Sequence, residues 1–256
     1  MFVTAIFSIK GGVGKTAAAV NLATLSSMSG EKTLLIDLDP QASSTFYLKV
    51  KPRIQTTVKK LLKMKSPIEK HIKATDFFHL DILPGSIDFR ALDPVLGKVK
   101  RPIDRIKEML EPLEEKYQWV FIDCPPGMTL LAEAIFCASD LIIVPVVPTT
   151  LSVRTYKDFR EYISKHPLKP GSRYMGFFSM TDRRKSLHRE ILDKWNYQEE
   201  LFSEISIPYL SDVERMGVLR KPVVSSRPSS EATFAFVKLW NEIQKAAGSN
   251  GSPDIQ

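Results

Sequence analysis

The stretch Lys10-Gly11-Gly12-Val13-Gly14-Lys15-Thr16 decides the fold of this chain. Residues 2–9, which precede it, are mostly apolar and β-branched, as in a buried strand. Residues 17–23, which follow it, are strong helix formers with apolar spacing. The glycines therefore lie in a turn from a strand into a helix, which is the setting that a phosphate-binding loop needs.

The residue types of this loop suit a bound phosphate chain. Three glycines allow consecutive backbone N–H groups to point inward, and the start of the following helix adds partial positive charge at the same place. Lys15 would reach β- and γ-phosphate oxygens, and the Thr16 hydroxyl would lie where Mg²⁺ binds. A glycine turn without a ligand is the structural alternative, and the length of the match makes it the weaker one.

Composition and length indicate an ordinary globular protein. The 256 residues are 43% hydrophobic and 25% charged, which suits one α/β domain. No apolar stretch is long enough to span a membrane and no signal peptide precedes the first strand, so we expect a cytoplasmic protein. Cys124 and Cys137 give no disulfide framework. The net charge of +7 suits a polyanionic partner without requiring one.

Strands and helices are predicted to alternate along the chain. Further strands are expected at residues 33–37, 79–85, 118–123, 140–146, 173–180 and 202–207. Helices are expected at residues 17–29, 103–117, 130–138, 151–164, 185–195 and 230–246, with Pro112 kinking or shortening the second of them. This alternation predicts a single-domain α/β fold over residues 1–247, with a mostly parallel twisted sheet and helices on both faces. Residues 248–256 are expected to form a disordered tail.

Three carboxylates follow predicted strands near the loop. Asp123 comes after four apolar residues and is placed like a Walker B aspartate, which would hold Mg²⁺ through water. Asp39 lies at a neighbouring strand edge and could orient the attacking water, while Asp37 could lie behind the metal. One such aspartate would more often be a strand-end or helix-cap acid. Three beside a phosphate loop favour a nucleotide hydrolase.

The loop resembles the deviant Walker A motif of the ParA/MinD family of ATPases, because Lys10 opens it. Segments 37–41 and 123–126 are similar to the two switch regions of that family, and segments 147–153 and 207–223 are similar to its later motifs. The resemblance implies a P-loop NTPase fold, ATP and Mg²⁺ as cofactors, and slow hydrolysis that a partner protein stimulates.

The resemblance also implies roles for numbered residues. Lys10 would reach the nucleotide of the other subunit in an ATP-dependent sandwich dimer. The implied catalytic residues are Lys10, Lys15 and Asp39. The implied metal site consists of Thr16, Asp37, Asp39 and Asp123. The implied ATP contacts come from the loop and from late residues near the adenine: Lys10, Gly11, Gly12, Val13, Gly14, Lys15, Thr16, Ala17, Ser179, Met180 and Pro208.

Four segments are rich in lysine and arginine: 49–73, 98–107, 183–189 and 215–227. We interpret the first two as solvated surface. The last two lie where similar partition ATPases bind DNA, and they supply the expected DNA contacts Arg183, Arg184, Lys185, Arg215, Arg220 and Lys221. We expect a ParA-like ATPase that binds DNA without sequence preference, since no helix-turn-helix precedes the first strand. It would position a plasmid, a chromosome locus or a protein assembly at the nucleoid, with a ParB-like or other stimulating partner.

Three other functions share this loop. A MinD-like membrane-associated ATPase is the main alternative. Residues 247–256 cannot form an amphipathic helix and core packing explains the apolar residues of 230–246, so no membrane binding is expected. A nitrogenase-like iron protein needs cluster ligands that the spacing of Cys124 and Cys137 does not supply, and both are expected to be core thiols. A cobyrinic acid a,c-diamide synthase is expected to need a glutaminase module, for which 256 residues leave no room.

Overall fold

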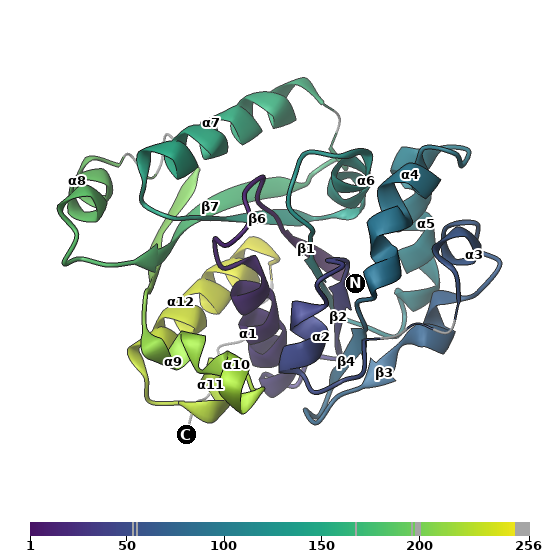
Figure 1. Cartoon of the computed structure of the whole chain (residues 1–256), viewed down its shortest axis with the longest axis horizontal. Coiled ribbons are helices and arrows are strands. Elements are labelled where there is room, and N and C mark those ends of the chain that lie inside the picture. The colour runs from purple at the N-terminus through teal and green to yellow at the C-terminus, as the bar shows by residue number, and fades with distance from the viewer. Residues whose placement is uncertain (53, 55, 167, 196, 198–200, 249–256) are drawn as a thin grey trace.

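Strand β1 (Phe2–Ile6) lies inside the sheet, between two strands that come much later in the chain. It pairs in parallel with β5 (Trp119–Asp123) on one side and with β6 (Leu141–Val146) on the other. The computed structural model describes residues 1–52, 54, 56–166, 168–195, 197 and 201–248. Within these residues one sheet, shown in Figure 1, has the strand order β3 (Lys73–Ala74), β4 (Leu80–Leu83), β2 (Thr33–Asp37), β5, β1, β6, β7 (Arg173–Thr181), β8 (Phe202–Pro208).

Helices cover both faces of this sheet (Figure 1). One hydrophobic cluster contains Val3 and Ala5 of β1 and lies under α3 (Val58–Leu62), α4 (Leu92–Leu96), α5 (Arg105–Leu110), α6 (Leu130–Ala138), α7 (Thr150–Lys165) and α8 (Ser186–Lys194). The other contains Ile6 and lies under α1 (Lys15–Met28) and α12 (Glu231–Ala246). Successive residues of β1 thus face opposite cores, as strand geometry requires. Short helices and 3₁₀ turns complete the described elements: α2 (Ser43–Tyr47), α9 (Ser211–Glu214), α10 (Met216–Leu219), α11 (Val223–Ser226), η1 (Ile68–His71), η2 (Ile87–Ala91), η3 (Pro102–Asp104) and η4 (Glu111–Leu113).

The predicted fold class is confirmed, since every strand pair among the described residues is parallel except β3 with β4. The helix predicted at 103–117 is shorter than its apolar pattern, and the expected shortening at Pro112 is confirmed. α5 ends at Leu110, and Pro112 lies in η4, because proline lacks the N–H that would continue the helix. Strand β1 ends at Ile6 and not at residue 9. The predicted tail falls outside the described residues from 249 onward, and the domain boundary at 247 stays a prediction.

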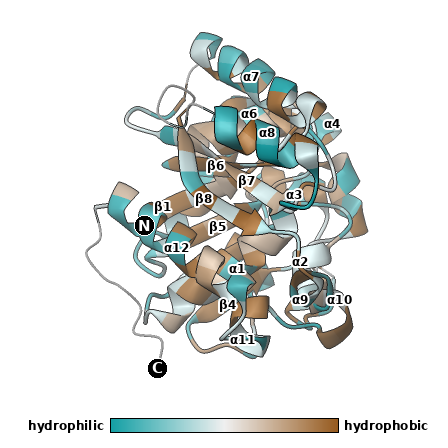
Figure 2. Cartoon of the chain, turned by 90° about the vertical axis from the view of Figure 1, so that its left-hand side faces the viewer, coloured by the Kyte–Doolittle hydropathy of each residue, from teal (hydrophilic) through white to brown (hydrophobic). Residues whose placement is uncertain are grey.

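Helix α12 buries one side against the sheet. Trp240 is fully buried, and its ring centroid lies 4.7 Å from that of Trp119 and 6.0 Å from that of Phe121. This packing agrees with the expectation that the core explains the apolar residues of this segment. Figure 2 shows apolar strands inside and polar residues on the outer helices α7 and α8. In the described part of the chain, no helix is both long and apolar enough to cross a membrane.

Candidate functional site

The glycine loop between β1 and α1 has a backbone that only small residues permit. Gly12 has φ 70° and Gly14 has φ 92°, both in the left-handed region that favours glycine. A Cβ atom at Gly14 would lie 2.6 Å from Ser179 Oγ, so a side chain there would also collide with β7. The sequence placed these glycines correctly in a strand-to-helix turn, and the loop closes against the end of a distant strand.

Lys15 is the buried cation of this loop. Its side chain starts on the first turn of α1, and its Nζ donates to the Lys10 carbonyl oxygen at 3.1 Å. Burial lowers its pKa, while the negative charges of Asp123 and Asp39 act in the opposite direction. Lys15 forms no ion pair with any residue that the structure describes. An ammonium group left with one carbonyl partner is suited to an anionic ligand.

Asp37 and Asp123 form a buried carboxylate pair. They lie opposite each other in the register of β2 and β5, and both are 0% exposed. Asp37 Oδ2 accepts hydrogen bonds from the Thr45 N–H at 2.8 Å and the Thr45 hydroxyl at 2.7 Å. Asp123 Oδ2 accepts one from the Ser44 hydroxyl at 2.8 Å. The Oδ1 atom of each aspartate is buried and has no hydrogen-bond partner among the described residues.

The electrostatics of this pair favour a bound cation. Burial raises the pKa of both carboxyl groups, and the negative charge of Asp123 raises the pKa of Asp37 further. The hydrogen bond from Ser44 and the nearby Thr16 hydroxyl lower the pKa of Asp123 in part. Two adjacent carboxylates and the Thr16 hydroxyl are hard oxygen donors, which Mg²⁺ prefers. The residues therefore fit a magnesium ion.

Such an ion would need further ligands from outside the protein. Among the described residues, no group of three or more His, Cys, Asp and Glu side chains is placed to hold a metal. Mg²⁺ commonly takes one or two carboxylates and completes its shell with water and phosphate oxygens. The donor set thus suits a magnesium ion that arrives with a phosphorylated ligand.

Asp39 and Lys10 occupy different places around the loop. Asp39 follows β2, lines the cavity, and accepts a hydrogen bond from the Gln41 N–H at 2.9 Å through Oδ1. Lys10 is partly exposed and does not line the cavity, although its carbonyl oxygen binds Lys15. The structure therefore brings Lys15, Thr16 and Asp39 together at the cavity wall and leaves the Lys10 side chain at the rim.

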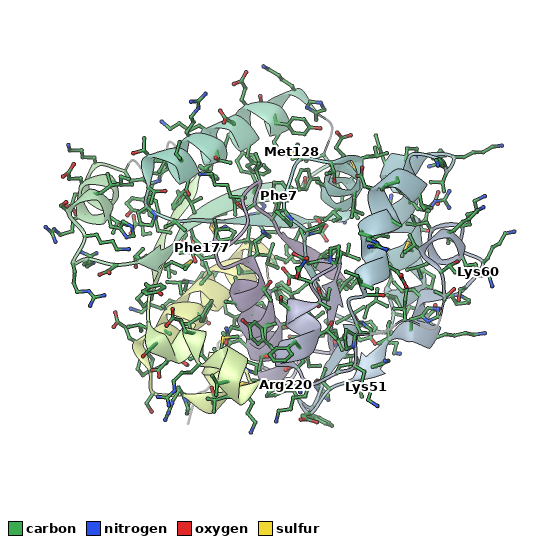
Figure 3. All side chains as sticks on the ribbon, viewed as in Figure 1. Phe7, Lys51, Lys60, Met128, Phe177 and Arg220 are labelled. Atoms are coloured by element: carbon green, nitrogen blue, oxygen red, sulfur yellow. The ribbon has the colours of Figure 1, made fainter. Side chains whose placement is uncertain are left out.

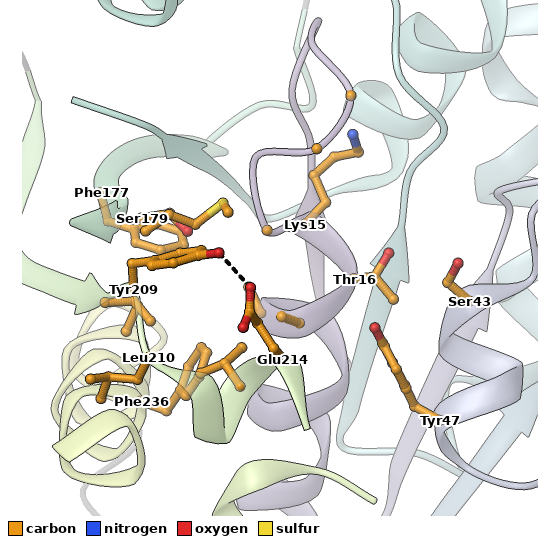
Figure 4. A pocket seen from close by; sticks show the side chains of 18 of the residues that line it. Lys15, Thr16, Ser43, Tyr47, Phe177, Ser179, Tyr209, Leu210, Glu214 and Phe236 are labelled. Atoms are coloured by element: carbon orange, nitrogen blue, oxygen red, sulfur yellow. Dashed lines mark hydrogen bonds between the residues drawn. The ribbon is translucent and has the colours of Figure 1, made fainter. Parts of the chain in front are cut away.

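A cavity of about 450 Å³ begins at the loop and extends toward the C-terminal half of the chain. One end has the loop and Lys15, and the other end is mostly apolar (Figure 4). Its lining includes Ser179, Met180 and Pro208, which were expected near an adenine. A cavity that is charged at one end and mostly apolar at the other matches a nucleotide, which has a polyanionic phosphate chain and a flat base. The lining also includes residues that the sequence did not suggest: Tyr47, Phe177, Tyr209, Leu210, Glu214 and Phe236.

Helix α2, which carries the hydroxyl partners of the carboxylate pair, was not predicted from the sequence. Ser44 and Thr45 reach Asp123 and Asp37 because α2 follows the turn after β2 and packs beside β2 and α1. A hydroxyl-rich run directly after Asp39-Pro40 was the available signal. In Figure 4, Tyr209 donates a hydrogen bond to Glu214 at the far side of the cavity, a pairing that sequence spacing alone does not reveal.

The expected DNA contacts lie in two exposed turns. Residues 183–185 form the turn between β7 and α8, and residues 215–221 surround α10. Two of the six side chains already have protein partners. Arg184 pairs with Asp182 at 2.9 Å, and the guanidinium of Arg220 lies over the Phe46 ring. The other four are exposed and form no ion pair within the described residues: Arg183, Lys185, Arg215 and Lys221.

The two cysteines differ in their burial. Cys124 is fully buried next to Asp123, as expected of a core thiol. Cys137 is only partly buried, so the expectation of a core thiol is wrong for this residue.

Comparisons with known proteins point to one family. A family model described as an AAA domain matches residues 1–169, which include the loop and all three carboxylates. The chain is 29% identical over 247 residues to the virulence plasmid ParA family protein pGP5-D of Chlamydia psittaci, covering 94% of this chain and 93% of that protein. It is 28% identical over 249 residues to the chromosome partitioning protein ParA of Caulobacter vibrioides, again covering 94% and 93%.

Solved structures share the fold. A cobyrinic acid a,c-diamide synthase from Mycobacterium smegmatis with bound ADP and magnesium has a TM-score of 0.81 at 24% identity, over 98% of this chain and 97% of that chain. At this identity the likeness shows the fold alone. The expectation that 256 residues leave no room for a glutaminase module stays a prediction.

Proposed function

Because this chain belongs to the ParA/MinD family of partitioning ATPases, we propose that it is a positioning ATPase that hydrolyses ATP to ADP and phosphate with Mg²⁺. The observation that carries this proposal is the buried pair Asp37 and Asp123 beside the phosphate loop, with one unsatisfied oxygen on each. Buried polar atoms normally have hydrogen-bond partners, so the unsatisfied oxygens support a cation in this place.

In this proposal the loop and its first helical turn bind the triphosphate. Lys15 and the loop N–H groups would hold the β- and γ-phosphates, and Thr16 with the carboxylate pair would hold the ion. Mg²⁺ would supply charge stabilisation for the transferring phosphoryl group. Asp39 is held by the Gln41 N–H in a turn at the cavity wall, where it would orient the attacking water.

ATP would create a sandwich dimer in which Lys10 acts across the interface. The position of Lys10 at the rim, outside the cavity of its own subunit, supports this role. The dimer would bind DNA without sequence preference through exposed cations of the turns at 183–185 and 215–221. A ParB-like or other partner would stimulate slow hydrolysis, and the cargo would be a plasmid, a chromosome locus or a protein assembly at the nucleoid.

Membrane association of the MinD type is the second candidate. Its usual requirement is an amphipathic segment whose apolar side is available to lipid. In α12 that side is occupied, because Phe236, Leu239, Trp240 and Ile243 are buried in the core. The DNA-binding alternative therefore has the stronger support.

Two substitutions test nucleotide binding and hydrolysis separately. Lys15→Ala should weaken ATP binding by about 100-fold, because the triphosphate loses its buried counter-charge. Asp39→Ala should keep ATP affinity within about twofold and lose turnover by about 100-fold, because water positioning alone is removed. Calorimetry measures the affinity, and steady-state phosphate release measures turnover.

Asp193→Ala, which removes an exposed carboxylate on α8, is the control and should match the wild type in both assays. Equal ATP affinity in the wild type and Lys15→Ala would reject the nucleotide site. Full turnover by Asp39→Ala would assign water positioning to another carboxylate, with Asp37 the next candidate.

A further inference from the structure

Helix α2 connects the carboxylate pair to the nucleotide cavity. Ser44 donates to Asp123, Thr45 donates to Asp37, and Tyr47 lines the cavity. An isolated helix of this length is unstable in water. The position of α2 therefore depends on the contacts that other parts of the chain make with it.

Arg220 makes such a contact from outside the site. Its guanidinium carbon lies 4.5 Å from the centroid of the Phe46 ring, and its Nε donates to the Phe46 carbonyl oxygen at 3.1 Å. Arg220 has φ 48°, a left-handed conformation that is uncommon outside glycine, and it ends α10. Figure 2 shows α2 next to α10, and Figure 3 labels Arg220 below α2.

The segment that carries Arg220 is anchored on α1, the helix that follows the phosphate loop. The Asn21 side chain donates from Nδ2 to the sulfur of the buried Met216 at 3.3 Å, and its Oδ1 accepts from the Val224 N–H at 3.2 Å. These hydrogen bonds hold the segment against α1, and Arg220 contacts α2 from this segment. Lys221, the next residue, is exposed and forms no ion pair with any described residue.

We propose that Arg220 is a positioning residue that couples α2, and through it the carboxylate site, to the exposed basic segment 215–221. This inference rests on the proposed function and adds a route by which the nucleotide state reaches the DNA surface. In this proposal Arg220 acts on α2, because its Nε donates to the Phe46 carbonyl oxygen and its guanidinium lies over the Phe46 ring. The carboxylate site and the basic segment 215–221 both contact α2. Coupling between two sites requires one such element whose position both of them influence.

Hydrogen exchange of the Thr45 amide tests the contact directly, because this N–H donates to Asp37. In the nucleotide-free full chain, Arg220→Ala should speed this exchange by about tenfold, and Arg220→Lys should restore part of the protection. Phe46→Leu removes the ring but keeps the carbonyl acceptor, so it should speed the exchange less than Arg220→Ala does. Lys221→Ala, the adjacent cation, is the matched control and should leave the exchange unchanged.

A second measurement separates coupling from DNA contact. Titrations of random-sequence duplex with ATP and with ADP give the ratio of the two affinities. Arg220→Ala should lower this ratio by about tenfold, because coupling is lost. Lys221→Ala should weaken binding in both states by the same factor, as a phosphate contact does.

Unchanged exchange of the Thr45 amide in a folded Arg220→Ala variant would overturn the proposal. An equal loss of DNA affinity with ATP and ADP in Arg220→Ala would also overturn it and assign Arg220 to the DNA surface. A wild type that neither hydrolyses ATP nor binds DNA would reject the proposed function, while the exchange experiment would still decide whether Arg220 positions α2.

Discussion

Burying Asp37 and Asp123 without a bound cation costs free energy of folding. Both are fully buried, they face each other across β2 and β5, and one oxygen of each has no hydrogen-bond partner in the described structure. Burial and the charge of Asp123 raise the pKa of Asp37 to about 7. The nucleotide-free protein thus holds a proton on this pair that an unfolded chain would release at the same pH.

Asp37 should therefore make the stability of the nucleotide-free protein depend on pH in one direction. An unfolded aspartate has a pKa of about 4. The stability that Asp37 contributes by binding a proton is fully present below that pH and is lost as the pH rises through the folded pKa of about 7. Asp37→Asn should reduce this dependence, with the raised pKa of Asp123 leaving a smaller one, and should raise the unfolding free energy at pH about 8 by about 2 kcal/mol relative to the wild type.

Urea unfolding in a buffer with a metal chelator, at several pH values, measures this difference. Asp158→Asn is the matched control, because it removes an exposed carboxylate on α7 and should keep the wild-type pH dependence. An Asp37→Asn variant whose stability follows the wild type from pH about 4 to about 8 would contradict the assignment of a raised pKa.

Among the helices, α12 packs as a core helix and not as a membrane anchor, because its apolar side is buried. Trp240→Ala should lower the unfolding free energy by about 3–5 kcal/mol, because a fully buried aromatic ring leaves a cavity. Phe234→Ala, on the exposed side of the same helix, should change it by less than about 0.5 kcal/mol. Denaturant unfolding compares the two variants. Equal effects would contradict the packing of α12 against β5.

The long elements and the phosphate loop could be predicted from the sequence, and the short helix α2 could not. Apolar periodicity specifies α6, α7 and α12 because each buries a whole stripe of residues. The five residues of α2 carry no such pattern, and tertiary hydrogen bonds to Asp37 and Asp123 hold it. Likewise the place of Lys15 and Asp39 beside the loop could be predicted from local motifs, whereas the Tyr209–Glu214 pair and the Arg220–Phe46 contact depend on how other segments pack.

At the scale of the whole molecule, the exposed cations decide how the protein would meet DNA. Arg183, Lys185, Arg215 and Lys221 form no ion pair within the described residues, so they can exchange their counterions for phosphate. One subunit offers few such contacts, and a dimer doubles the number. Binding should therefore appear with the ATP dimer and should depend steeply on salt.

The most direct test of ATP-dependent DNA binding is a fluorescence anisotropy titration of random-sequence duplex DNA with the Asp39→Ala variant at several salt concentrations. With ATP the variant should bind, with a log–log salt slope of about −0.9 per phosphate contact, and with ADP its binding should be much weaker. Adding Lys10→Gln should weaken the ATP-dependent binding by weakening the dimer, and adding Arg215→Glu with Lys221→Glu should remove it while ATP binding remains. The absence of DNA binding by the ATP-loaded Asp39→Ala protein at low salt would contradict the proposal that the ATP-bound dimer binds DNA.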